Sequence, residues 1–302
     1  MLSKKQIICP ENLLKIAKSK GPVKAVVVNA GKETSIESAK QAVDEGLIEP
    51  IFIGDKKIIK LLAGDISWDI SKYRIIDEPT ENNTAPIAAN LASEGEVKII
   101  VKGHIHTDIL MKSVLKRDLN LIGKKRLSHV WHMTLEKNDK PFIITDGALN
   151  VLPKLETKMH ILKNSVNFAK RIGINRPRVS ILSATEEVLE SVPSSIDAKE
   201  LTSRAFKEGI EADVFGPMAF DNSVSEEAAQ IKGIKNVVAG KTDILLVPNV
   251  ETGNGLVKMM IYFMGACAAG VVVGGKVPVV ITSRADSAPA RLASIAAAIV
   301  SL

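Results

Sequence analysis

Two stretches near the end of the chain combine residue types that could bind an anion and react with it. In each stretch an apolar strand pattern, at residues 244–247 and again at 277–281, ends in small polar and charged residues and is followed by a helix pattern. Ligands of open α/β sheets bind where strands end and helices begin, because the first turn of a helix offers free N–H groups and the positive end of its dipole. The two stretches therefore predict an anion site.

The first stretch continues into Glu251, Asn254 and Lys258, which supply a carboxylate, an amide and a cation. Gly253 and Gly255 lie between them. Because glycine has no Cβ, these two positions allow the backbone to approach a bound ligand closely. Glycine turns are common, so this spacing alone identifies no particular ligand.

The second stretch contains Ser283, Arg284 and Asp286 directly after the strand pattern. Arg284 can hold a phosphate with two parallel hydrogen bonds, and the Ser283 hydroxyl can donate a further hydrogen bond. The alternatives are a helix N-cap for Ser283 and a surface salt bridge for Arg284. These residue types predict a site that recognises phosphate.

The densest basic cluster of the chain lies between residues 112 and 126. It could be a solvated helix face with its loop, or it could capture the phosphate groups of a substrate by charge. The cluster consists of Lys112, Lys116, Arg117, Lys124, Lys125 and Arg126.

From about residue 97 onward the chain resembles the phosphate acetyl/butyryltransferase family. The segments that carry the resemblance occur in the order expected for that family, and residues 221–228 are similar to its butyryltransferase branch. The segments are Lys102-Gly103, residues 128–133, 145–150, 215–217, 221–222 and 282–287, and Glu251-Thr252-Gly253-Asn254 with Lys258. Together they are specific, whereas each alone is weak.

The resemblance implies a reversible acyltransferase reaction. A short acyl group, butyryl or acetyl, would pass between coenzyme A and inorganic phosphate to give acyl phosphate. Because phosphate is already anionic at neutral pH, positioned arginine and serine donors suffice for this chemistry. The resemblance also implies that coenzyme A is a substrate, that no cofactor is tightly bound, that no metal is needed, and that the protein forms a homodimer or a larger homo-oligomer.

The family's functional positions fall on matching residues of this chain. The resemblance implies catalytic roles for Ser283, Arg284 and Asp286. It implies phosphate or coenzyme A contacts for Lys112, Arg126, Ser128, Asp221, Glu251, Gly253, Asn254 and Lys258. Lys112 is a departure in type, because the family carries arginines here and a lysine keeps the charge but loses the two-pronged hydrogen bond. Asp221 could instead cap the helix that follows it.

One position departs from the acetyltransferase pattern. Those enzymes carry an aspartate seven residues after the serine, proposed as the base for the thiol proton, and this position is Ala290 here, followed by Arg291. Asp286 could act as the base, or the step could proceed without one, because a thiol needs only a modest fall in pKa. The departure favours the butyryl branch. It also leaves a catalytically silent acyl-CoA-binding relative as an alternative.

The elements around these residues alternate between strand and helix patterns, which predicts an α/β fold with doubly wound sheets. The length of 302 residues is typical of two domains. We expect one domain from residues 1–136 with 275–302 and a second from residues 137–274. The resemblance implies an isocitrate/isopropylmalate dehydrogenase-like layout with the site in the interdomain cleft. An NAD-dependent dehydrogenase is a further alternative, although no Gly-x-Gly-x-x-Gly follows a strand.

Composition and short patterns argue against several other classes of protein. The net charge of +6 could suggest nucleic-acid binding, but only 4% of residues are aromatic and the lysines are scattered among 34 acidic residues. Two cysteines are too few for a disulfide framework, and the N-terminus lacks a secretory signal, so we expect a cytoplasmic protein. The histidines at 104, 106, 129 and 132 lack the spacing of a zinc site.

Two local patterns give further expectations. Residues 259–275 are uncharged, but their glycines favour a buried helix end, a turn and a short strand over a membrane span. Ser183 and Glu186 match a capping box, which predicts a helix that starts after Ser183.

Overall fold

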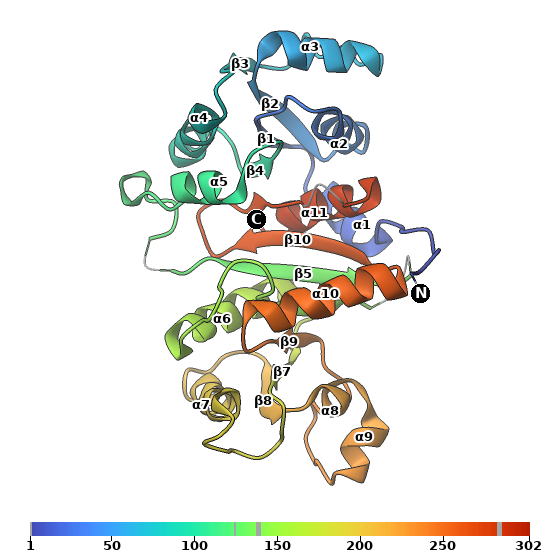
Figure 1. Cartoon of the computed structure of the whole chain (residues 1–302), viewed down its shortest axis with the longest axis vertical. Helices are drawn as coiled ribbons and strands as arrows, with labels where there is room; N and C mark the ends of the chain where they lie inside the picture. Colours follow the sequence, from blue (N-terminus) through green and yellow to red (C-terminus); the bar gives the residue numbers. More distant parts are fainter. Residues whose placement is uncertain (1, 124, 137–139, 283–285) are drawn as a thin grey trace. The chain divides into compact units, whose positions relative to one another are not determined.

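The structure is a computed structural model that describes residues 2–123, 125–136, 140–282 and 286–302. The chain forms two compact units, whose elements are coloured along the sequence in Figure 1. The first unit comprises Ile7–Lys125 and Ala269–Leu302, and the second comprises Met1–Gln6 and Arg126–Ala268. The domain boundaries expected from the sequence, 136/137 and 274/275, lie further along the chain than these limits and stay a prediction.

The first unit is a mainly parallel sheet with helices from both of its segments. Its strands are β1 (Val23–Val28), β2 (Ile48–Gly54), β3 (Ile75–Asp77), β4 (Ile99–Lys102), β11 (Val279–Val280) and most of β10 (Cys267–Val273). Its helices are α1 (Glu11–Ser19), α2 (Glu33–Asp44), α3 (Lys56–Asp65), α4 (Glu81–Glu94), α5 (Thr107–Val114) and α11 (Ala288–Val300), with a 3-10 turn η1 (Arg117–Leu119). The strand order is β3-β2-β1-β4-β11-β10, and β10 pairs with β11 in antiparallel fashion.

The strand order of the first unit reverses next to β1. The chain runs outward from β1 to β2 and β3 and then returns to place β4 on the other side of β1, with all of these pairs parallel. The side chains of β1 and β4 are mostly buried, as expected for strands that are covered on both faces. Doubly wound sheets bind their ligands at such a reversal, outside the carboxyl ends of the strands.

Helix α11 belongs to the core of the first unit. It packs against α1 and α2, and every residue from 292 to 300 is buried. This burial places the alanine-rich helix in the core of the first unit.

The second unit repeats the α/β alternation. Its strands are β5 (Ser128–Thr134), β6 (Phe142–Thr145), β7 (Arg178–Leu182), β8 (Asp213–Met218) and β9 (Ile244–Leu246). Its helices are α6 (Leu155–Arg171), α7 (Pro193–Lys207), α8 (Phe220–Val224), α9 (Glu226–Ile231) and α10 (Val250–Met264). The strand order is β5-β6-β9-β7-β8; β5 and β6 are antiparallel and the other pairs are parallel. The predicted α/β fold is thus confirmed.

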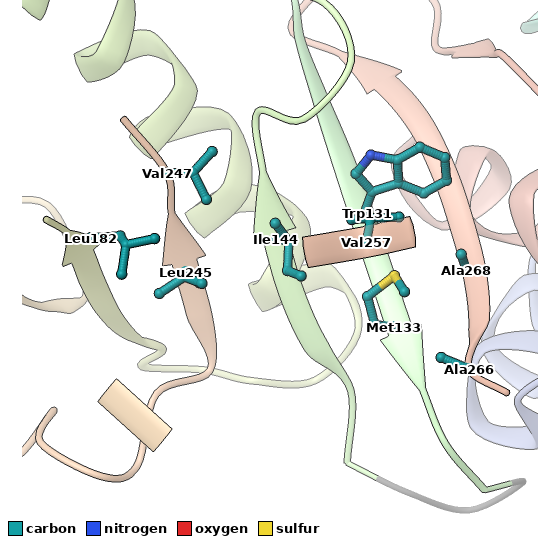
Figure 2. Close-up of a cluster of buried hydrophobic side chains, with 9 residues drawn as sticks. All are labelled: Trp131, Met133, Ile144, Leu182, Leu245, Val247, Val257, Ala266 and Ala268. Atoms are coloured by element: carbon teal, nitrogen blue, oxygen red, sulfur yellow. The ribbon is translucent and has the colours of Figure 1, made fainter. Parts of the chain in front are cut away.

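A cluster of apolar side chains fixes α10 against the strands of the second unit. Figure 2 shows Val257 of α10 beside the side chains of β5 and β6. Burial of each large aliphatic side chain contributes about 1.5–3 kcal/mol, so this cluster sets where α10 lies over the sheet. Its members are Trp131, Met133, Ile144, Leu182, Leu245, Val247, Val257, Ala266 and Ala268.

The uncharged segment after Lys258 has the structure that its glycines indicated. Helix α10 ends at Met264, Gly265 follows in the left-handed region with φ of 69°, and β10 begins at Cys267. None of the described helices is long and apolar enough to cross a membrane.

The capping-box prediction at Ser183 was wrong. Turns follow this residue, and the next helix, α7, begins only at Pro193. The Ser183 hydroxyl lies 2.9 Å from the Ser194 hydroxyl, and the Glu186 carboxylate accepts a hydrogen bond from Lys232 at 2.8 Å. Partners from other parts of the second unit therefore occupy the groups that a capping box would have used.

Candidate active site

The junction between β9 and α10 forms as the spacing predicted. Asn249 is the N-cap of α10, and its side-chain oxygen accepts hydrogen bonds from the Thr252 N–H at 3.0 Å and the Thr252 hydroxyl at 2.7 Å. Such a cap satisfies a donor that the first helical turn would otherwise leave without a partner. Glu251 and Asn254 are exposed on this turn, and Lys258 is half-buried one turn further on.

Two glycines, Gly147 and Gly253, lie against each other between the loop after β6 and the first turn of α10. A Cβ on Gly253 would lie 2.6 Å from the Cα of Gly147, and a Cβ on Gly147 would lie 2.8 Å from the carbonyl carbon of Gly253. The Asn254 amide donates to the Gly147 carbonyl oxygen at 3.3 Å. The close backbone approach that the sequence indicated at Gly253 is thus made by the protein's own loop. Its expected contact with substrate stays a prediction.

Asp146 holds this loop in position with both carboxylate oxygens. Oδ1 accepts from the N–H groups of Ala148 at 3.0 Å and Leu149 at 2.9 Å. Oδ2 accepts from the His129 N–H at 2.9 Å and from the Asn150 amide at 2.6 Å. Sequence reasoning noted this residue only as part of a family segment and missed its structural role, because its partners come partly from another strand.

Burial controls the charge of the histidines on β5. It lowers the pKa of His129 to about 4, against an opposing effect of the Asp146 carboxylate, and it lowers the pKa of His132 to about 4. Both side chains are therefore neutral at pH 7. Among the residues that the structure describes, no three His, Cys, Asp or Glu side chains gather as ligands for a metal ion.

Arg126 and Ser128 lie at the start of β5. The amide of Asn164 on α6 donates to the Ser128 hydroxyl and to the Arg126 carbonyl oxygen, both at 2.9 Å. Ser128 is fully buried and fastens α6 to the strand, whereas the Arg126 side chain is exposed. A contact of Ser128 with substrate stays a prediction.

Asp221 lies in an ionic cluster on α8. The Lys232 ammonium is 3.2 Å from the Asp221 carboxylate and 2.8 Å from that of Glu186. The hydrogen bond from Lys232 to Asp221 is the main cause that lowers the pKa of Asp221. The alternative role of Asp221 as a helix cap is wrong. Ser225 caps α9 instead, through a hydrogen bond from the Ala228 N–H at 3.2 Å.

At the second junction, Ser283 and Arg284 lie outside the described residues. Ser287 occupies the N-cap position of α11, which is the position that we had considered for Ser283. Asp286 is half-buried, and its backbone carbonyl oxygen accepts a hydrogen bond from the Arg291 guanidinium.

The predicted site residues fall into two sets, one in each unit. The first unit holds Lys112, which is exposed in the last turn of α5, together with Asp286. The second unit holds Arg126, Ser128, Asp221, Glu251, Gly253, Asn254 and Lys258. Within the second unit, the structure brings Gly253 and Asn254 together with the loop at Gly147. Asp221 and its ionic cluster lie elsewhere, after the end of β8.

Known proteins are similar to this chain in both sequence and fold. The family description "Phosphate acetyl/butaryl transferase" matches residues 78–299. A phosphate acetyltransferase of Rhizobium meliloti is 40% identical over 289 residues, which cover 95% of this chain and 92% of that protein. A phosphate butyryltransferase of Clostridium acetobutylicum is 38% identical over 289 residues, which cover 95% and 96% of the two chains.

Solved structures agree with these relatives. A branched-chain phosphotransacylase from Enterococcus faecalis superposes with a TM-score of 0.80 at 31% identity, covering 92% of this chain and 98% of that one. A 4-hydroxythreonine-4-phosphate dehydrogenase from Klebsiella pneumoniae shares the fold alone. It superposes with a TM-score of 0.59 at 13% identity, covering 93% of this chain and 100% of that one. The dehydrogenase-like architecture predicted from the sequence is thus confirmed.

The fold and the sequence relatives together define an acyltransferase with an α/β architecture. Within that class, the chain belongs to the phosphate acetyl/butyryltransferase family. The identities to the acetyl and butyryl enzymes, 40% and 38%, are so similar that they do not distinguish between the two acyl groups.

Proposed function

We propose that this chain transfers a short acyl group, butyryl or acetyl, between coenzyme A and inorganic phosphate, with acyl phosphate as the product. The observation that carries this proposal is the family match over residues 78–299, a range that contains every predicted site residue. The curated relatives that support it are similar along almost the whole chain, so the proposal concerns the whole protein and not one module.

Arg284 and Ser283 are the residues that we expect to act on the reacting groups. An oxygen of phosphate attacks the thioester carbonyl carbon, a C–O bond forms, and the C–S bond breaks to release the thiolate. A guanidinium that donates two hydrogen bonds to phosphate would position the nucleophile. The serine hydroxyl would donate to the carbonyl oxygen or to the leaving sulfur as negative charge develops there.

The carboxylate and the basic side chains have supporting roles in this proposal. In the reverse direction the thiol of coenzyme A must lose its proton, and Asp286 is the expected base because Ala290 supplies no carboxylate. Lys112, Arg126 and Lys258 would bind the phosphate groups of the coenzyme by charge. The remaining expected contacts are those of Ser128, Asp221, Glu251, Gly253 and Asn254, and no tightly bound cofactor is required.

The decisive test is phosphate-dependent release of free thiol from acetyl-, propionyl- and butyryl-CoA. We expect turnover that requires phosphate and that falls by at least about 100-fold in Arg284→Ala, since this change removes charge-assisted hydrogen bonds to the nucleophile. Arg171→Ala is the matched control, because Arg171 is an exposed arginine at the end of α6. The ranking of the three substrates would then identify the preferred acyl group.

The presence of Ala290 favours one alternative, an acyl-CoA-binding relative without activity. Binding of acyl-CoA with no phosphate-dependent thiol release from any of the three substrates would support that alternative and exclude the acyltransferase reaction.

We further propose that the protein acts in the cytoplasm as a homodimer or a larger homo-oligomer. Four large apolar side chains near the end of α10 support an interface between copies of this chain. Their exposed fractions are 40% for Met259, 44% for Tyr262, 57% for Phe263 and 41% for Met264. Contiguous apolar side chains of this kind commonly mark contact surfaces between proteins.

A further inference from the structure

The first unit contains a small cavity at the reversal of its strand order. The cavity has a volume of about 50 Å³ and lies at the carboxyl ends of β1, β4 and β11. A single water requires roughly 10–15 Å³ on the same scale, so the cavity has room for a small tetrahedral anion but not for a nucleotide. Its position is the one where doubly wound sheets bind ligands.

The lining of the cavity has the chemistry of an anion site. Two cations contribute to it, Lys102 at the end of β4 and Arg291 in the first turn of α11, and the cavity has no Asp or Glu among its described lining residues. Four hydroxyl groups, from Thr34, Ser35, Ser38 and Thr282, also line it. The residues at 34 and 35 belong to the first turn of α2, whose N-terminus is favourable for negative charge.

Arg291 has donor capacity that the described structure does not use. One terminal nitrogen of its guanidinium donates to the Asp286 carbonyl oxygen, whereas its Nε is buried and finds no hydrogen-bond partner among the described residues. A buried donor without a partner costs free energy, and a bound oxyanion would satisfy it. The neighbouring position Ala290, where the acetyltransferase pattern has a carboxylate, presents no negative charge that would repel such an anion.

The floor of the cavity is held rigidly by the ends of β1 and β4. The Gly103 N–H donates to the Val28 carbonyl oxygen at 2.9 Å, and the Asn29 amide donates to the His104 carbonyl oxygen at 2.6 Å. A Cβ on Gly103 would lie only 2.4 Å from the Val28 oxygen, so this approach requires glycine. A site that is formed before its ligand arrives loses less conformational entropy on binding.

We propose that this cavity binds inorganic phosphate, and that Arg291 and Lys102 are two of its charged ligands. The inference rests on the proposed function, because it makes this phosphate the acyl acceptor. Thr282 lines the cavity and directly precedes the predicted catalytic residues Ser283 and Arg284 in the sequence. Arg291 then supplies positive charge to the phosphate from the first turn of α11. In the acetyltransferase pattern the neighbouring position, Ala290 here, carries a carboxylate.

The first test is calorimetric binding of inorganic phosphate to the full chain without acyl-CoA. We expect Arg291→Gln and Lys102→Gln each to weaken phosphate binding at least about tenfold, because each change removes a charge-assisted hydrogen bond to the anion. Arg291→Lys, which keeps the charge, should show a smaller loss. Lys60→Gln on the exposed surface of α3 is the control and should bind phosphate as the unmodified protein does.

The second test separates phosphate from the other substrate by steady-state kinetics. We expect the KM for phosphate to rise at least about tenfold in Arg291→Gln, with the KM for acyl-CoA within about twofold of its original value. Thermal unfolding of each variant shows whether it is folded. Calorimetry tests the cavity even if the protein turns over no acyl-CoA, so failure of the proposed function and failure of this inference are distinguishable.

Three results would overturn the inference. Unchanged phosphate binding in both charge-removing variants would exclude the cavity as the phosphate site. A fall in kcat with unchanged phosphate affinity in Arg291→Gln would show that Arg291 only positions the segment around Asp286 through their hydrogen bond. Arg291→Gln could instead raise only the KM for acyl-CoA, with no such increase for the 3′-dephospho form of that substrate. This result would assign the cavity to the coenzyme's 3′-phosphate.

Discussion

At Gly253 the demands of packing override helix propensity. Glycine inside a helix normally costs up to about 1 kcal/mol relative to alanine. Here a Cβ would meet the Cα of Gly147 at 2.6 Å, so the smaller residue allows the loop and α10 to pack against each other. Gly255, two residues further along the same helix, has no atom from outside the adjacent helix backbone within 4 Å of its Cβ position.

The contrast gives a prediction with an internal control. Gly253→Ala should lower the free energy of unfolding by about 1–3 kcal/mol, because backbone atoms must move to admit the methyl group. Gly255→Ala should raise it by about 0.5–1 kcal/mol, because alanine favours the helix and meets open space. Urea unfolding measures both. Equal effects of the two substitutions would contradict the packing argument.

The buried histidines of β5 predict how stability depends on pH. The pKa of His132 is about 4 in the folded chain, below the ordinary value of 6.5, because burial disfavours its charged form. Between these values the unfolded chain binds protons that the folded chain does not, so stability falls as the pH falls. We expect this residue to remove about 2 kcal/mol between pH 7 and pH 5.

Urea unfolding at pH 7 and pH 5 checks this expectation. His132→Phe keeps an aromatic ring and removes the titrating group, so its loss of stability over this range should be smaller by about 2 kcal/mol. If His132→Phe loses as much stability as the unmodified protein, burial of this histidine does not control the response.

Residue types pointed to the catalytic candidates, but not to the tertiary hydrogen bonds elsewhere in the structure. The sequence led to Ser283, Arg284 and Asp286 through their place after a strand pattern and through the family resemblance. It did not reveal the hydrogen bonds of Asp146 or the hydrogen bond from the Gly103 N–H to the Val28 carbonyl oxygen, because both depend on strands that are distant in sequence. Side-chain type is visible in a sequence, whereas tertiary hydrogen bonding is not.

At the scale of elements, the cap of α10 can be tested by itself. Asn249→Ala removes the acceptor for the Thr252 N–H and hydroxyl, so we expect a loss of about 1 kcal/mol in the free energy of unfolding. Asn249→Ser should restore most of this loss, because serine is also a good N-cap. Thermal unfolding measures both variants, and similar stabilities of the Ala and Ser variants would show that the cap contributes little.

The elements that were predicted well are those that hydrophobic pattern determines. The strand at 244–246 and the turn after α10 follow from apolar runs that end in glycine, proline or polar residues. The capping box at Ser183 failed because its hydroxyl and the Glu186 carboxylate have tertiary partners. Local patterns therefore specify an element reliably only where no distant group competes for the same side chains.

At the scale of the whole molecule, the apolar end of α10 predicts self-association. Phe263→Glu should reduce the mass measured by light scattering, because it places a charge at the proposed interface. Phe206→Glu is the matched control, since Phe206 is 88% exposed on α7 and lies outside that surface. A monomeric mass for the unmodified protein, or an unchanged mass in Phe263→Glu, would contradict the proposal.

The first unit is discontinuous in sequence, and this has a consequence for biosynthesis. β11 and α11 belong to its sheet and core, yet a ribosome adds them only after the whole of residues 126–268. During translation the surface of segment 7–125 that α11 will cover therefore stays exposed to water until residues 126–268 have been synthesised. The protein would therefore depend most on chaperones while its chain is still incomplete, because exposed apolar surface promotes aggregation.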